Sequence, residues 1–141
     1  MAISDLDELL KNMAPKVVEG KHHFASVDEG NLMAVANYLS YVVDVFREEE
    51  GLSIVFQEDI LEGMKELSDK EVLGPFAMIT LSVNSDLTAV GFLAKVADAL
   101  AKEGISSNVF SAYHHDHLFV PYEKKDDAMR VLRRLSGPGR G

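Results

Sequence analysis

Two β-rich hairpins, each followed by a helix, predict an α+β fold for this chain of 141 residues. An apolar strand and a long amphipathic helix precede the second hairpin, which gives the order strand, helix, hairpin, helix. That order is the core of a split βαβ, ferredoxin-like (βαββαβ) sandwich, in which helices cover one face of an antiparallel sheet. The sequence therefore predicts a ferredoxin-like α+β protein.

The first half of the chain contains a series of short elements. We expect a helix at 6–13, a strand at 22–27, a short helix at 31–39, a hairpin of strands 41–47 and 52–56, and a helix at 59–67. Ser4 opens a capping-box-like pattern before the first helix, and Pro15 ends that helix. The hairpin strands are rich in β-branched and aromatic residues, and one long helix through Val45 is the alternative.

The second half shows clearer patterns. We expect a strand at 76–83, a helix at 87–103, a hairpin of strands 108–114 and 117–122, a helix at 126–135, and a flexible tail from about 136. Gly104 stands where a left-handed C-terminal cap belongs. Gly91 lies inside the long helix, where glycine costs about 1 kcal/mol relative to alanine. Close approach of another backbone would explain Gly91, and a tolerated loss is the alternative.

Composition and charge exclude several classes of protein. The chain has no cysteine, which removes disulfides, thiolate nucleophiles and cysteine-type metal sites. Its net charge is −9, and residues 1–70 carry 15 acidic and 6 basic residues whereas residues 71–141 carry 8 of each. Such an acidic chain binds nucleic acid or anionic membranes poorly. No apolar run approaches a membrane span and no signal-peptide pattern is present, so we expect a cytoplasmic protein.

A weak internal repeat suggests two related halves. At an offset of 65 residues, Val55 corresponds to Val120 and Glu58 to Glu123, so a hairpin strand, an acidic exit and a helix occur twice. We therefore divide the chain into subdomains 1–73 and 74–141. No strand follows Leu135 to complete the second sheet, so we expect the strand at 22–27 to fill that place and the two halves to interlock.

Four segments resemble a known family. They are 46–52 (FREEEGL), 79–85 (ITLSVNS), 104–109 (GISSNV) and 114–121 (HHDHLFVP). The second and third resemble an ACT domain, and the whole chain is similar to small stand-alone proteins with two ACT-like domains in tandem. The resemblance implies two interlocked ACT-like subdomains in a homodimer. It also implies sensing of a small-molecule effector, typically an amino acid, at a domain or subunit interface, without a fused enzyme or a cofactor.

The resemblance implies an effector site made of two segments. The candidate ligand-binding residues are Asn84, Ser85, Asp86, Leu87, Ile105, Ser106, Ser107 and Asn108. Free backbone N–H groups at the N-terminus of the following helix attract a carboxylate, and Asp86 disfavours an anion unless it faces the ammonium of a ligand. The alternative is that Ser85 or Asp86 only caps the helix and Asn108 bonds nearby backbone.

Histidines cluster in the second hairpin. If residues 115–116 form its turn, His114 and His117 become cross-strand neighbours with Cβ atoms about 5 Å apart. With further ligands added, this cluster offers a zinc or nickel site from His114, His115, His117, Asp116, His22 and His23. Two alternatives remain open, which are a structural role in the turn and an interface that responds to pH.

Three hypotheses of function follow. The chain lacks a Ser-His-Asp order, a phosphate-binding glycine loop, an HExxH motif and a Rossmann fingerprint. The first hypothesis is therefore a non-catalytic regulatory protein that binds an effector of the amino-acid class. The second is a metal-binding or histidine-dependent enzyme that uses the cluster from His114 to His117. The third is a pure protein-interaction module.

Overall fold

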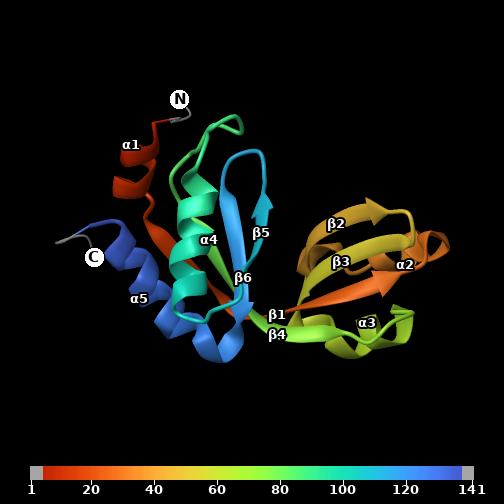
Figure 1. Cartoon of the computed structure of the whole chain (residues 1–141). Helices are drawn as coiled ribbons and strands as arrows, with labels where there is room; N and C mark the ends of the chain where they lie inside the picture. Colours follow the sequence, from red (N-terminus) through yellow and green to blue (C-terminus); the bar gives the residue numbers. More distant parts are fainter. Residues whose placement is uncertain (1–4, 138–141) are drawn as a thin grey trace. The chain divides into compact units, whose positions relative to one another are not determined.

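The computed structural model describes residues 5–137, which form two compact units (Figure 1). Unit 1 consists of Met1–Glu19 and Ala77–Gly141, and unit 2 consists of Gly20–Phe76. The helices are α1 (Leu6–Lys11), α2 (Leu32–Ala36), α3 (Leu61–Leu67), α4 (Phe92–Lys102) and α5 (Lys125–Leu135). The strands are β1 (Pro15–Val27), β2 (Val42–Glu48), β3 (Gly51–Gln57), β4 (Leu73–Leu81), β5 (Asn108–Ser111) and β6 (Asp116–Pro121).

The strands confirm the predicted ferredoxin-like α+β fold. Their order is β2-β3-β1-β4-β6-β5, and β1 and β4 each extend through both units. Unit 2 uses β2-β3-β1-β4 with helices α2 and α3, and unit 1 uses β1-β4-β6-β5 with α1, α4 and α5. In each unit the two central strands lie beside each other between the two outer ones, as in a split βαβ sandwich.

The strand that completes unit 1 differs from the expectation. Residues 15–19, the first part of β1, take this place, and the amides of Ser82 and Val83 donate to the carbonyls of Ala14 and Met13 at 3.3 Å. Residues 22–27 pair instead with β3 in unit 2, from His22 opposite Gln57 to Val27 opposite Leu52. The chain thus passes between the units twice, and a division at 73/74 separates residues 1–19 from the unit in which they lie.

The N-terminal segment contributes directly to the core of unit 1. Leu9 and Met13 are fully buried and belong to the same hydrophobic cluster as Ile79, Leu100 and Leu118. Asp5 is the N-cap of α1 and accepts a hydrogen bond from the Glu8 amide at 3.1 Å, which satisfies a free N–H of the first turn. The predicted cap Ser4 lies outside the described residues.

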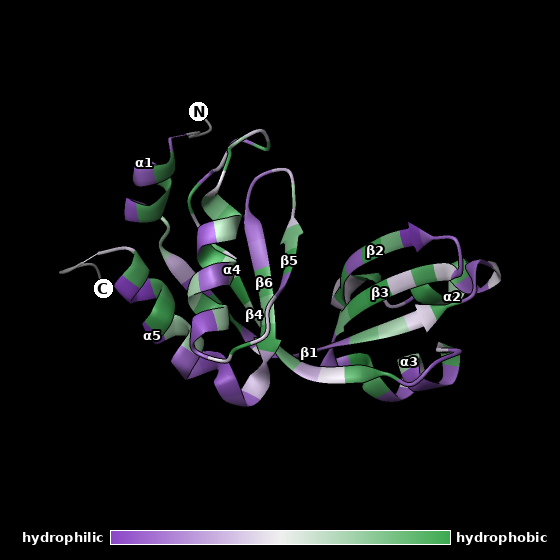
Figure 2. Ribbon diagram, viewed as in Figure 1, coloured by the Kyte–Doolittle hydropathy of each residue, from purple (hydrophilic) through white to green (hydrophobic). Residues whose placement is uncertain are grey.

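Helices α4 and α5 pack side by side on this core. Figure 2 shows that hydrophilic and hydrophobic residues alternate around both helices, as expected for surface helices with one buried face. The inward residues of α5 include Ala128, Val131 and Leu132, as the periodicity predicts. Ser136, where a flexible tail was expected, is buried at the end of α5 and donates to the Leu132 carbonyl at 3.2 Å. Residues 138–141 lie outside the described part.

Unit 2 has a smaller core around its own hairpin. The predicted hairpin is confirmed as β2 and β3, with a register irregularity between Val42 and Asp44, and the alternative of one long helix is wrong. Ile54, Phe56 and Met64 are fully buried between the sheet and its helices. The helix expected at 31–39 is reduced to the five residues of α2, between two short 3-10 turns.

Two adjacent histidines of β1 are buried in unit 2. His22 is fully buried and His23 is 5% exposed, and the His23 ring stacks on Phe56 and lies 3.0 Å from the Glu58 carboxylate. Burial, with a further contribution from His23, lowers the pKa of His22 below its ordinary value.

No helix within residues 5–137 is long and apolar enough to cross a membrane.

Replacement of Met13 tests whether the N-terminal segment belongs to the core of unit 1. Met13→Ala should lower the free energy of unfolding by about 2–5 kcal/mol, because it leaves a cavity among fully buried residues. Met33→Ala is the matched control, since Met33 is 77% exposed and its loss should cost about 0.5 kcal/mol or less. Chemical denaturation followed by circular dichroism measures both, and equal losses in the two variants would contradict the assignment.

The lowered pKa of His22 predicts how stability depends on pH. The folded protein favours the neutral imidazole, so its contribution is complete above the unfolded-state value of 6.5 and is lost as the pH falls below 6.5 toward the folded-state pKa. The free energy of unfolding should therefore decrease from pH 7.5 to pH 5.5 (about two pH units), and less steeply in His22→Gln. His114→Gln, which changes an exposed histidine, should retain the wild-type slope. Identical slopes in all three proteins would exclude His22 as the cause.

Candidate functional site

A buried hydrogen bond joins the loop after β4 to strand β6 in unit 1. Ser85 is 7% exposed and its hydroxyl donates to Oδ2 of Asp116 at 2.8 Å. Asp116, which the sequence places in the hairpin turn, is instead the first residue of β6 and is 4% exposed. The predicted site residue Ser85 is thus held in place by the carboxylate of Asp116, a residue that the sequence suggested as a turn residue or a metal ligand.

The β5–β6 hairpin has a longer turn than expected. Ser111 pairs with Asp116, and the Ala112 amide donates to the His115 carbonyl at 3.0 Å, so residues 112–115 form the turn. His117 lies opposite Phe110, and the expected pairing of His114 with His117 is therefore wrong. The turn remains exposed at Tyr113 and His114, whose rings meet edge to face at 4.9 Å.

The histidine rings of this hairpin are near neighbours, with the centroids of His114 and His115 6.3 Å apart. The His117 ring nitrogen Nδ1 lies 3.0 Å from the Thr80 hydroxyl, and burial, with a smaller effect of His115, lowers the pKa of His117. The ring centroids of His115 and His117 are 6.5 Å apart. Within residues 5–137, no group of three or more His, Asp or Glu side chains is placed to hold a metal ion. The metal-site alternative therefore receives no support from the part of the chain that the structure describes.

Helix α4 begins later than its sequence pattern predicts. The first helical residue is Phe92 rather than Leu87, and Gly91 is the N-cap with φ +90°. Gly91 therefore lies outside the helix interior, and a left-handed backbone conformation explains the glycine better than either explanation offered from the sequence. Asp86 accepts from the amide and the hydroxyl of Thr88 at 2.8 and 2.7 Å, which closes a turn within the loop and lowers the pKa of Asp86.

Two neighbouring hollows lie around this loop. The inner cavity has a volume of about 120 Å³ and is lined by Ser85, Asp86, Leu87, Ala89, Gly91, Phe92, Leu93, Ala94, Ser111 and Asp116. The outer hollow has a volume of about 440 Å³ and is lined by Asn84, Ser85, Asp86, Leu87, Tyr113 and His114. All four predicted residues of the first segment line at least one of these hollows, and three line both.

The inner cavity presents opposite polarities. The amides of residues 92–94 precede the first hydrogen bond of α4, which Lys95 donates to the Gly91 carbonyl at 3.0 Å, and Gly91 has no side chain to cap them. These amides carry the positive end of the helix dipole. The acidic residues Asp86 and Asp116 also line this cavity. The first turn of a helix and two acidic residues therefore border the same cavity.

The second predicted segment lies elsewhere in unit 1. Ile105 follows the C-terminal end of α4, an eleven-residue helix about 16 Å long, and does not line either hollow. It lines a separate hollow of about 230 Å³ with Glu103, Asp127, Arg130, Val131 and Arg134. Ser106, Ser107 and Asn108 line none of these three hollows. The structure thus does not bring the two predicted segments together in unit 1.

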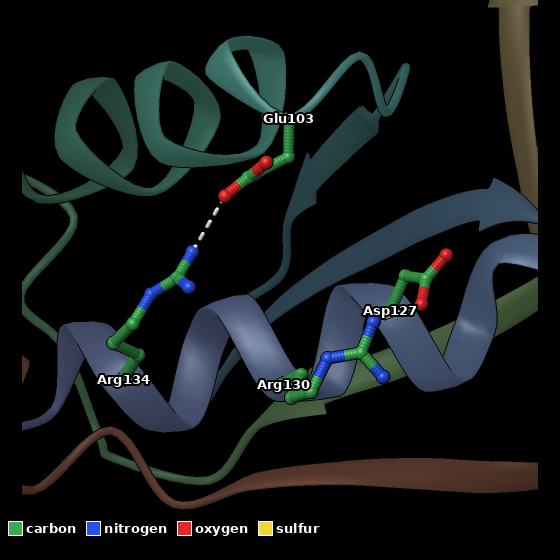
Figure 3. Close-up of polar contacts among 4 residues, drawn as sticks. All are labelled: Glu103, Asp127, Arg130 and Arg134. Carbon is green, nitrogen blue, oxygen red and sulfur yellow. Dashed lines mark hydrogen bonds and ion pairs between the residues drawn. The ribbon is translucent and has the colours of Figure 1, made fainter.

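Side chains that form ion pairs with one another line the hollow at Ile105. Figure 3 shows Arg134 directed toward Glu103, and the Arg134 guanidinium donates to the Glu103 carboxylate at 2.8 Å. Arg130 pairs with Asp127 one turn earlier on α5. All four side chains are about half exposed or more, so solvent weakens these pairs.

Several residues of the candidate site are not among those predicted from the sequence to bind an effector. Asp116, Ser111 and the start of α4 line the inner cavity, and Tyr113 lines the outer hollow. Gly91 is the signal in the sequence that favours this arrangement, because glycine readily adopts the positive φ found at the N-cap of α4. The four-residue turn at 112–115, which brings Asp116 into the sheet, is seen in the structure alone.

This chain, which is built from two ferredoxin-like units, is similar to known proteins that identify its family. ACT-domain family models match residues 75–134 and residues 1–60. A protein of unknown function from Vibrio cholerae, described as a possible transport protein, is 36% identical in its crystal structure. The alignment covers 94% of this chain and 96% of that chain, with a TM-score of 0.76. The chain belongs to the ACT-domain family.

More distant structures share the fold. Aspartokinase alpha and beta subunits are 15% identical, with a TM-score of 0.69 and coverage of 86% of this chain and 95% of that chain. The regulatory subunit of aspartate kinase from Thermus flavus is 11% identical, with a TM-score of 0.67 and coverage of 87% and 97%. None of the curated proteins matches the sequence. Family membership supports a regulatory role of the ACT type.

Removal of the Ser85 hydroxyl should destabilise unit 1. Ser85→Ala takes away the hydroxyl donor of the buried Asp116 carboxylate and should lower the free energy of unfolding by about 1–3 kcal/mol. Ser106→Ala, a matched change at an exposed position, should cost about 0.5 kcal/mol or less. Urea denaturation measures the difference, and similar stabilities for the two variants would show that the hydrogen bond contributes little.

Proposed function

We propose that this protein is a regulatory, small-molecule-binding ACT protein whose effector is an amino acid or a similar metabolite. The observation that supports the proposal is the inner cavity of unit 1, which is lined by the first residues of α4, where no side chain caps the helix, and by the acidic residues Asp86 and Asp116. An α-amino acid carries the complementary pair of charged groups, a carboxylate and an ammonium. The proposal assigns binding rather than catalysis to this site.

The predicted residues take different parts in this proposal. Ser85, Asp86 and Leu87 line the inner cavity and bind the charged groups of the effector or exclude water, while Asn84 borders its outer extension. Ile105, Ser106, Ser107 and Asn108 are not assigned to the same bound molecule in unit 1. The homodimer, the position of the site at a domain or subunit interface and the cytoplasmic location stay predictions.

A blocking substitution at the start of α4 tests the proposal. Ala94 lines the inner cavity in the first turn of α4, so Ala94→Glu places a carboxylate where the effector carboxylate would bind. The acidic side chain suits the helix N-terminus, so the fold should remain intact. Lys95→Glu is the control, because Lys95 is exposed in the same turn and does not line the cavity.

Thermal denaturation with each of the twenty standard amino acids at millimolar concentration provides the measurement. At least one amino acid should raise the midpoint of unfolding by about 3 °C or more in the wild type and in Lys95→Glu, and by clearly less in Ala94→Glu. If no amino acid changes the midpoint of the wild-type protein, the proposed function is wrong.

A further inference from the structure

Asp116 is a buried carboxylate that no described lysine or arginine pairs with, and its neighbour His117 is the one histidine that interacts with it electrostatically among the described residues. Asp116 is 4% exposed, its one hydrogen-bond donor is the neutral Ser85 hydroxyl, and no ion pair among residues 5–137 includes it. Burying a carboxylate is costly unless a cation or several donors compensate it. Asp116 lines the inner cavity, so a cationic group bound there would provide that compensation.

Asp86 adds a second negative charge to the same cavity. Two hydrogen bonds from Thr88 lower the pKa of Asp86, which therefore stays ionised at neutral pH. Among residues 5–137, neither a lysine nor an arginine lines the inner cavity or the outer hollow. The side chains of the site thus provide charge for an ammonium group, and its preference for a carboxylate comes only from the amides of α4.

We infer that an ammonium group is the obligatory feature of the effector and is bound by Asp116 and Asp86. Amino acids and amines therefore bind here, and carboxylic acids that lack the amino group do not. This inference rests on the proposed function and extends it to the chemical class of the effector. An ammonium has three N–H donors, and charge-assisted hydrogen bonds to carboxylates are stronger than neutral ones. The carboxylate of an amino acid then adds affinity but is not required.

The remaining lining residues favour a small aliphatic group next to the ammonium. Leu87, Phe92 and Leu93 line the inner cavity, whose volume is about 120 Å³, and Leu87 also borders the larger outer hollow. Apolar groups here would lose contact with water on binding, which stabilises the complex. L-Alanine, L-valine and L-leucine are therefore suitable probes, together with analogues that lack one charged group.

The experiment compares three matched sets of compounds by isothermal titration calorimetry on the full chain. The amino acids are L-alanine, L-valine and L-leucine, the amines are ethylamine, isobutylamine and 3-methylbutylamine, and the acids are propanoate, 3-methylbutanoate and 4-methylpentanoate. At least one amino acid and its amine should bind, and the corresponding acid should bind at least about tenfold more weakly.

Asp116→Asn should weaken binding of the amino acid and the amine about tenfold or more, because it removes the buried charge. The amide oxygen still accepts from Ser85, so the variant should fold, and Asp86→Asn in the exposed loop provides a second test that does not depend on burial. Asp98→Asn is the control, since Asp98 pairs with Lys102 on α4 outside the cavity. It should leave every dissociation constant unchanged.

The outcomes separate this inference from the proposed function. If an acid without an ammonium binds as tightly as its amino acid, or if both Asp116→Asn and Asp86→Asn leave the affinity unchanged, the inference is wrong while the protein still binds effectors. If none of the nine compounds binds, the inference is also wrong, and the wider panel of twenty amino acids decides the proposed function on its own.

Discussion

Unit 1 cannot complete its sheet from residues 77–141, because the described chain contains no strand after α5. The first part of β1 fills this place, and most of the architecture depends on it. The thirteen residues of β1 belong first to unit 1 and then, from Gly20, to unit 2. Since Leu9 and Met13 precede this strand, its position brings both side chains into the core of unit 1. One strand therefore contributes residues to the sheets of both units.

The register of the β5–β6 hairpin determines which residues meet at the candidate site. With residues 112–115 as the turn, Asp116 enters the sheet and meets the Ser85 hydroxyl. A turn at 115–116 would instead leave Asp116 in solvent and Ser85 without this partner. The hydrogen bond holds the loop between β4 and α4, and that loop forms one wall of both hollows. The site is thus a consequence of turn length as much as of residue identity.

The sequence predicts those features that depend on repeating patterns. The apolar faces of α4 and α5 and the β-branched and aromatic residues of β2 and β3 predict elements of the right type, and their order predicts the ferredoxin-like fold. The start of α4 could not be predicted in this way, because Leu87 and Val90 continue the helical pattern through a loop in which both side chains are exposed. Likewise, the first part of β1 mixes exposed and half-buried residues, so it lacks the strong alternation that identifies a strand.

The two ends of α4 differ in how their charges are balanced, and this difference explains why one end is the stronger candidate site. At the C-terminal end, the Glu103 carboxylate faces the negative end of the helix dipole, and Arg134 compensates it at 2.8 Å. At the N-terminal end, the free amides and the buried Asp116 carboxylate lie around one cavity without an internal ion pair to Asp116 among the described residues. Charges that the chain itself leaves uncompensated are those that a bound molecule can neutralise, and for this reason we place the proposed effector beside Ser85 rather than beside Ile105.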